Sequence, residues 1–88
     1  MVSKIVEIVN ENGLHTRQGN EFVALAQSFS SEIQLEDETG RKVSGISLLK
    51  ILSLGIRKGM KVVVHADGED EKEAIIKLEE LLKGMKDI

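Results

Sequence analysis

Four short stretches of the chain are rich in β-branched residues or alternate between apolar and polar positions, which is typical of half-buried strands. Residues such as Gly, Asn and Asp cluster between them and predict turns. In the last stretch Val62, Val64 and Ala66 share one face, while Lys61, Val63 and His65 take the other. The predicted strands cover residues 2–9, 33–36, 41–43 and 60–66.

Three other stretches repeat apolar residues at helical spacing. In the first of them Phe22, Ala26 and Phe29 recur on one side. Thr16 and Asn20 are alternative N-cap residues for this helix, because both side chains can accept a hydrogen bond from the first turn. The start of the first helix therefore stays open between these two positions.

The other two helices carry start and stop signals of their own. Ser47 suits the N-cap of a helix of about two turns, and Gly55 suits its C-terminal end. Asp70 and Glu73 have the spacing of a capping box before the third helix, which Gly84 ends. The apolar face of the third helix contains Ala74, Ile75, Leu78, Leu81, Leu82 and Met85.

The predicted order of elements is β-α-β-β-α-β-α. Helices with one apolar face bury it against another element, and a single sheet with its opposite face exposed to solvent can provide that surface. We therefore expect an α+β fold with a four-stranded antiparallel sheet and three helices on one face. With 88 residues the chain has room for one domain, which we expect over residues 1–88.

The amino-acid composition argues against several classes of function. The chain has 12 Lys+Arg, 15 Asp+Glu and a net charge of −3, with only 2% aromatic residues. Nucleic-acid binding is not expected, because it needs stacking rings or a basic surface. The absence of Cys excludes disulfides and thiolate sites, and two His fifty residues apart speak against a metal site. We expect no metal and no cofactor.

The length and hydropathy of the chain also bear on its location. No apolar run approaches the roughly 18 residues of a membrane span, and no apolar signal-peptide region follows Met1. We therefore expect a cytoplasmic protein without membrane contact. A chain this short has little core to spare for a deep pocket, which favours a surface-acting carrier, binding module or regulator.

Positive charge gathers in two stretches that contain no acid. Residues 12–20 contain Arg17, and residues 45–66 contain four cations. These four are Lys50, Arg57, Lys58 and Lys61. Solvated strand and helix edges explain such a pattern, but it also fits a local positive field for a phosphate or an acidic partner.

Gly13-Leu14-His15-Thr16-Arg17 precedes the start of the first helix. A helix N-terminus offers backbone N–H groups to an anion, and an imidazole can act as a nucleophile near neutral pH. The N–H groups of Thr16 and Arg17 and the guanidinium of Arg17 can then hold a phosphoryl group carried by His15. Taken alone, this segment is a weak signal, because a lone histidine at a loop–helix junction is more often a capping or surface residue.

Together, several motifs resemble one family, the histidine-containing phosphocarrier (HPr) family of the bacterial sugar phosphotransferase system. The resemblance covers nearly the whole chain, with the motifs in the family's order and spacing. The motifs are residues 13–17, residues 47–56, Lys58-Gly59 and residues 66–71.

The resemblance implies an open-faced β-sandwich and a role for each matching residue. His15 is expected to accept a phosphoryl group on Nδ1 from enzyme I and to pass it to the A domains of the enzymes II, with Arg17 neutralising the phosphate. Ser47 matches a regulatory serine that HPr kinase phosphorylates, and the seryl-phosphorylated form can bind a catabolite-control transcription factor. Leu48, Leu49 and Leu52 match partner contacts, and a monomer that acts as a stoichiometric carrier rather than an enzyme is expected.

The chain departs from the family directly after the arginine. The family usually has Pro followed by small residues, whereas this chain has Gln18, Gly19 and Asn20. Loss of a proline that presets φ loosens the unfolded chain, and Gly19 adds flexibility. We expect a less rigid site, with Asn20 able to move the helix start away from His15.

Other interpretations stay open beside the carrier. Ser47 can be a plain N-cap, and the protein can be a regulatory relative that works through Ser47 and docking with weak or no phosphotransfer. A small acylphosphatase-like enzyme has a similar element order, but the loop here places His15 before Arg17. His65 is expected to be an ordinary polar residue on a strand.

Overall fold

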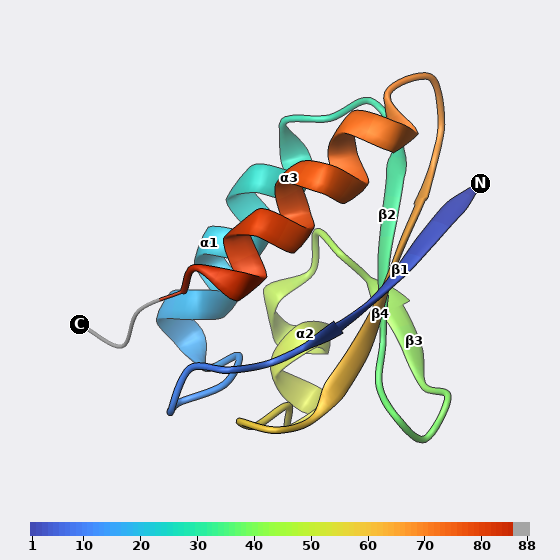
Figure 1. Cartoon of the computed structure of the whole chain (residues 1–88). Helices are drawn as coiled ribbons and strands as arrows, with labels where there is room; N and C mark the ends of the chain where they lie inside the picture. The colour runs from blue at the N-terminus through green and yellow to red at the C-terminus, as the bar shows by residue number, and fades with distance from the viewer. Residues whose placement is uncertain (86–88) are drawn as a thin grey trace.

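The seven elements follow the predicted order in the computed structural model, which describes residues 1–85. Figure 1 shows a sheet with all three helices on one side, so the expected open-faced α+β architecture is confirmed. The elements are β1 (Val2–Glu7), α1 (Thr16–Gln27), β2 (Glu32–Glu36), β3 (Lys42–Ser44), α2 (Leu48–Ser53), β4 (Lys61–Asp67) and α3 (Glu71–Lys83).

The sheet has the strand order β1-β4-β2-β3, and every neighbouring pair is antiparallel. Strands β1 and β3 are therefore the edges, while β4 lies between β1 and β2. Val64 of β4 pairs with Leu35 of β2, and Val63 pairs with Ile5 of β1. Because side chains alternate along a strand, Val64 and Leu35 face the helices while Ile5 faces away and is 64% exposed.

The core lies between the helix-facing side of the sheet and the three helices. Val62, Val64 and Ala66 are buried together, as the alternation in β4 predicts. The helical spacing is confirmed as well, since Phe22 and Leu78 are fully buried on α1 and α3. This arrangement leaves the opposite face of the sheet exposed to solvent.

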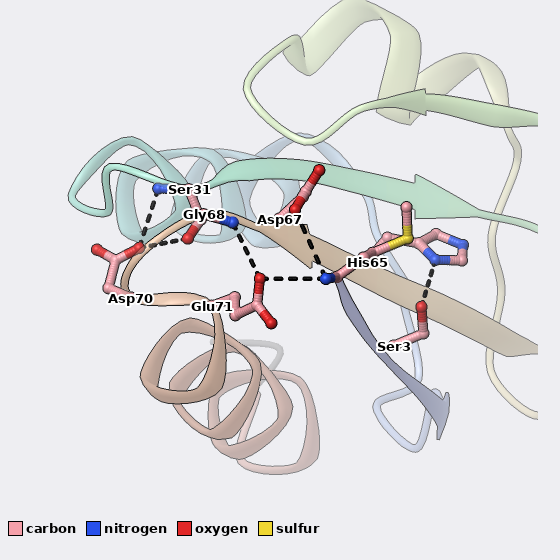
Figure 2. A network of polar contacts seen from close by, with 8 residues as sticks. Ser3, Ser31, His65, Asp67, Gly68, Asp70 and Glu71 are labelled. Atoms are coloured by element: carbon pink, nitrogen blue, oxygen red, sulfur yellow. Dashed lines mark hydrogen bonds and ion pairs between the residues drawn. The ribbon is translucent and has the colours of Figure 1, made fainter.

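On that open face, His65 links three strands. Its Nδ1 lies 2.6 Å from Ser3 Oγ of β1, and its Nε2 lies 2.7 Å from Glu36 Oε1 of β2. Figure 2 shows the first of these contacts. Polar cross-strand pairs of this kind stabilise a sheet, so His65 has the ordinary structural role that its place on the strand predicts.

All four predicted strands are shifted at one or both ends. Strand β2 begins at Glu32 rather than at residue 33, and β4 spans Lys61–Asp67 rather than residues 60–66. Strand β1 ends at Glu7 rather than at residue 9, although Ile8 N–H still donates to Met60 carbonyl at 2.9 Å. Strand β3 spans Lys42–Ser44 instead of residues 41–43. Such shifts of one or two residues arise because pairing, rather than the side-chain pattern, decides where a strand stops.

The predicted capping box of the third helix is wrong. Asp70 occupies the N-cap position but makes no side-chain bond to its own helix. Its carboxylate instead accepts hydrogen bonds from the backbone N–H groups of Ser30 and Ser31, both at 2.9 Å, and from the Ser31 hydroxyl. Figure 2 shows Asp70 directed at Ser31, and Glu71 accepting from Gly68 N–H at 3.1 Å. Asp70 therefore joins the start of α3 to the entrance of β2.

We expect Asp70→Asn to lower the Tm at neutral pH by about 5 °C, because the amide cannot accept all three hydrogen bonds. The Ser31 hydroxyl and then the Ser30 backbone N–H hold the pKa of Asp70 below its ordinary value of 3.8. A carboxylate whose pKa is lower in the folded than in the unfolded state stabilises the fold fully at pH values above its unfolded-state pKa. This stabilisation is lost as the pH falls through the folded-state pKa. The Tm difference between wild type and Asp70→Asn should therefore narrow below about pH 4.

The matched control is Glu69→Gln, which removes the same charge from an exposed neighbouring side chain. Its Tm should follow that of wild type across the same pH range. A Tm difference for Asp70→Asn that stays constant down to about pH 2 would contradict the role given to the Asp70 carboxylate.

Candidate functional site

Helix α1 begins directly after His15, which is its N-cap residue. Neither Thr16 nor Asn20 caps the helix, so both N-cap predictions are wrong. His15 is extended, with φ −83° and ψ −172°, and its carbonyl accepts the first helical hydrogen bond from Gly19 N–H at 2.7 Å. The start of the helix has therefore not moved away from His15, despite the absence of the proline.

This geometry places the imidazole at the positive end of α1. The first N–H groups of a helix, here those of Thr16 and Arg17, have no carbonyl partner within the helix. The first turn contains no acidic residue, so nothing in it offsets the partial positive charge. The side chains of His15, Thr16 and Arg17 are all exposed. An anion bonded to His15 would thus lie next to backbone donors.

The residues before His15 are anchored to the loop that follows α2. Leu14 is buried, and its N–H donates to the Ile56 carbonyl at 3.1 Å. Asn10 Nδ2 donates to the Gly13 carbonyl at 2.8 Å. Gly13 itself has φ +60°, which favours glycine. These contacts fix the backbone that leads into His15.

We expect Gly13→Ala to lower the free energy of unfolding by about 2 kcal/mol, because strain at positive φ adds to a steric clash. A Cβ at Gly13 would lie 2.3 Å from the Ile56 carbonyl oxygen and 2.7 Å from the Arg57 Cα. Gly55 is the matched control, since its φ is +63° and no atom lies within 4 Å of its Cβ position. Gly55→Ala should cost about 1 kcal/mol in chemical denaturation. Equal losses for the two variants would show that the contact with Ile56 does not constrain the site.

The residues that replace the family's usual Pro and Ala are buried, and Gly19 among them packs against α2. Gln18 is buried, at 3% exposure, and Gly19 is buried beside it. A Cβ at Gly19 would lie 2.7 Å from Leu48 Cδ1, so the two helices approach each other closely here. This contact brings the first turn of α1 and the α2 helix onto one side of the molecule.

Helix α2 begins with the predicted N-cap. Ser47 is extended, and its Oγ accepts a hydrogen bond from Lys50 N–H at 3.4 Å. The helix also exposes apolar side chains, because only Ile51 is buried while Leu49 is 81% exposed. We use the name α2 apolar surface for Leu48, Leu49 and Leu52.

A surface depression joins His15 to the end of α2. Its volume is ≈ 310 Å³. Arg17 does not line it, whereas Arg57, which the sequence marked only as one of four cations, does. The lining residues are Asn12, Leu14, His15, Leu52, Gly55, Ile56 and Arg57. The structure thus brings together His15, Leu52 of the α2 apolar surface and Arg57.

Residues 1–85 contain neither a membrane-spanning helix nor a cluster of metal ligands. No helix there is long and apolar enough to cross a membrane. No group of three or more His, Cys, Asp or Glu side chains in that range lies close enough together to hold a metal ion.

Comparison with known proteins gives consistent similarities. The family model described as "PTS HPr component phosphorylation site" matches residues 2–84. The chain is 45% identical to "Phosphocarrier protein HPr" of Haemophilus influenzae over 85% of this chain and 87% of that protein. It is 41% identical to the protein of the same name from Borreliella burgdorferi over 99% and 100% of the two chains. The crystal structure "HPr-C-His" from Thermoanaerobacter tengcongensis has a TM-score of 0.89 at 41% identity, over 94% of this chain and 92% of that one.

Proposed function

The chain belongs to the HPr phosphocarrier family, and on that premise we propose that it accepts a phosphoryl group from enzyme I on His15 and passes it to enzyme II A domains. One observation supports this proposal above the others. His15 is the exposed N-cap residue of α1, so its imidazole stands beside the backbone donors of the first turn.

The proposed step needs an unprotonated Nδ1 on His15. Its lone pair attacks the phosphorus, the new N–P bond forms, and the donor's bond to phosphorus breaks with its electron pair returning to the donor. The N–H groups of Thr16 and Arg17 and the Arg17 guanidinium hold the phosphoryl oxygens. Transfer to an acceptor repeats the step in reverse, so the protein is a stoichiometric carrier rather than an enzyme.

The α2 apolar surface is proposed to dock both partners. Leu49 is largely exposed and Leu52 lines the same depression as His15, so a partner seated on α2 would reach the imidazole. Exposed apolar patches of this kind mark partner sites. Phosphorylation of Ser47 by HPr kinase would regulate this docking and allow binding to a catabolite-control transcription factor. We propose a monomeric, cytoplasmic protein with a single domain over residues 1–88.

Incubation with enzyme I and phosphoenolpyruvate tests the proposal. We expect one phosphate per chain, stable in alkali and lost in acid, as a phosphoramidate should be. Omitting enzyme I is the control and should leave the chain unmodified. A chain that takes up no phosphate under these conditions would instead favour the regulatory relative that acts through Ser47.

A further inference from the structure

Arg57 lines the same surface depression as His15, although the two residues lie 42 positions apart in the sequence (57 − 15). Arg57 is exposed, and it is the one cationic side chain in the lining of this depression. Arg17, which the family motif identifies as the phosphate-neutralising residue, is absent from that lining. The depression that His15 lines therefore has a cation of its own.

The loop that carries Arg57 is fixed to the first strand and its extension. Gly59 N–H donates to the Ile8 carbonyl at 2.8 Å, and Ile8 N–H donates to the Met60 carbonyl at 2.9 Å. Within the loop, Met60 N–H donates to the Arg57 carbonyl at 3.1 Å, and Ile56 is buried. Backbone held at several points fixes the place from which the Arg57 side chain starts.

The same loop touches the backbone just before His15. The Ile56 carbonyl accepts from Leu14 N–H, and the position of a Cβ on Gly13 is only 2.7 Å from the Arg57 Cα. The Arg57 backbone is thus packed against the residue two positions before the imidazole. A flexible arginine side chain that starts from this point has the phosphoryl position within its range.

The charge of Arg57 is available for a ligand. Within residues 1–85 no carboxylate forms an ion pair with its guanidinium. The neighbouring Lys58 differs, because its Nζ pairs with Glu11 Oε1 at 2.5 Å. Two adjacent cations therefore have different surroundings, and Arg57 is the one that lines the depression.

We propose that Arg57 is a second guanidinium that binds the phosphoryl group carried by His15, a role that rests on the proposed carrier function. A guanidinium presents paired N–H donors that match two phosphate oxygens, so it favours the doubly charged form of the group. Arg57 would act from the loop after α2, while Thr16 and Arg17 act from the first turn of α1. The site then holds the phosphate from two elements instead of one.

Titration of the phosphorylated protein by phosphorus NMR tests this inference. The second ionisation of a protein phosphate has a pKa of about 6, and a nearby cation lowers it. Arg57→Gln should raise the pKa of the phosphoryl group by at least about 0.5, since the cation that favours the dianion is lost. Arg57→Lys keeps the charge without the planar fork and should lie between Arg57→Gln and wild type.

Lys58→Gln is the matched control, because it removes one positive charge from the adjacent residue. Its phosphoryl pKa should stay close to that of wild type. Equal titration curves for Arg57→Gln and wild type would overturn the inference. This holds even if Arg57→Gln is loaded or discharged more slowly, because Arg57 would then contact carboxylates of a partner rather than the phosphoryl group. If wild type takes up no phosphate, the proposed function fails first and this inference fails with it.

Discussion

Replacing His15 with Ala should abolish phosphorylation by enzyme I, with a fall of at least about 1,000-fold in the initial rate, equivalent to ~4 kcal/mol. The imidazole is the proposed covalent acceptor, and no neighbouring group in the motif can replace a nitrogen nucleophile. His15 is exposed and its side chain makes no capping bond, so the variant should fold normally. Transfer of radioactive phosphate from phosphoenolpyruvate measures the loss directly.

His65→Ala is the matched control for that experiment. It removes the only other histidine in the chain, which contacts Ser3 and Glu36 on the open sheet face. We expect a lower Tm but full phosphorylation, because the open face lies on the opposite side of the sheet from the helices. Phosphorylation of folded His15→Ala, or loss of phosphorylation in folded His65→Ala, would show that His15 is not the phosphate acceptor.

Ser47→Asp should slow phosphorylation by enzyme I by about 100-fold, equivalent to ~2.7 kcal/mol. Ser47 begins α2 directly before Leu48 and Leu49, so a carboxylate here lies on the proposed docking surface. The helix tolerates this charge, because an acid at an N-terminus is favourable for the dipole and Asp is a good N-cap. The slower rate should therefore appear without a loss of stability.

Ser47→Ala separates the charge from the loss of the cap. It removes the hydrogen bond from Lys50 N–H and should lower the free energy of unfolding by about 1 kcal/mol. Its rate with enzyme I should remain within about twofold of wild type, since no charge enters the docking surface. If Ser47→Asp and wild type are phosphorylated at equal rates, α2 does not dock enzyme I near Ser47.

The sequence pattern predicted the architecture because each element has a local signal. The helical spacing around Leu78 and the alternation through Val62 and Val64 decide which side faces the core, and burial follows directly. Ser47 was found for the same reason, since an N-cap and the turn after it are neighbours in sequence. Local signals of this kind need no knowledge of the tertiary fold.

The errors lie where a distant contact overrides a local preference. Thr16 and Asn20 are better N-cap residues than His15, yet the contact of Leu14 with Ile56 fixes the backbone and starts the helix after His15. Asp70 has capping-box spacing, but its carboxylate bonds to Ser31 instead of its own helix. In both cases tertiary hydrogen bonds outweigh an intrinsic preference of about 1 kcal/mol.

In the candidate site, too, some residues can be predicted from the sequence and others cannot. His15 and Arg17 are adjacent in a motif and can be selected from the sequence, whereas Arg57 is distinguishable from the other cations only after folding. Its place depends on the hydrogen bonds that tie the loop of residues 54–60 to Ile8 and Leu14. The spacing of residues along the sequence does not predict such long-range contacts.

The most direct measurement is a single transfer from the isolated phosphorylated chain to an enzyme II A domain. The chain is loaded with radioactive phosphate, separated from enzyme I and mixed with an equal amount of the acceptor. We expect the label to leave His15 and to appear on the acceptor in equal amount, with almost none released to water. Label that remains on the chain, or that appears only as inorganic phosphate, would contradict a carrier role for His15.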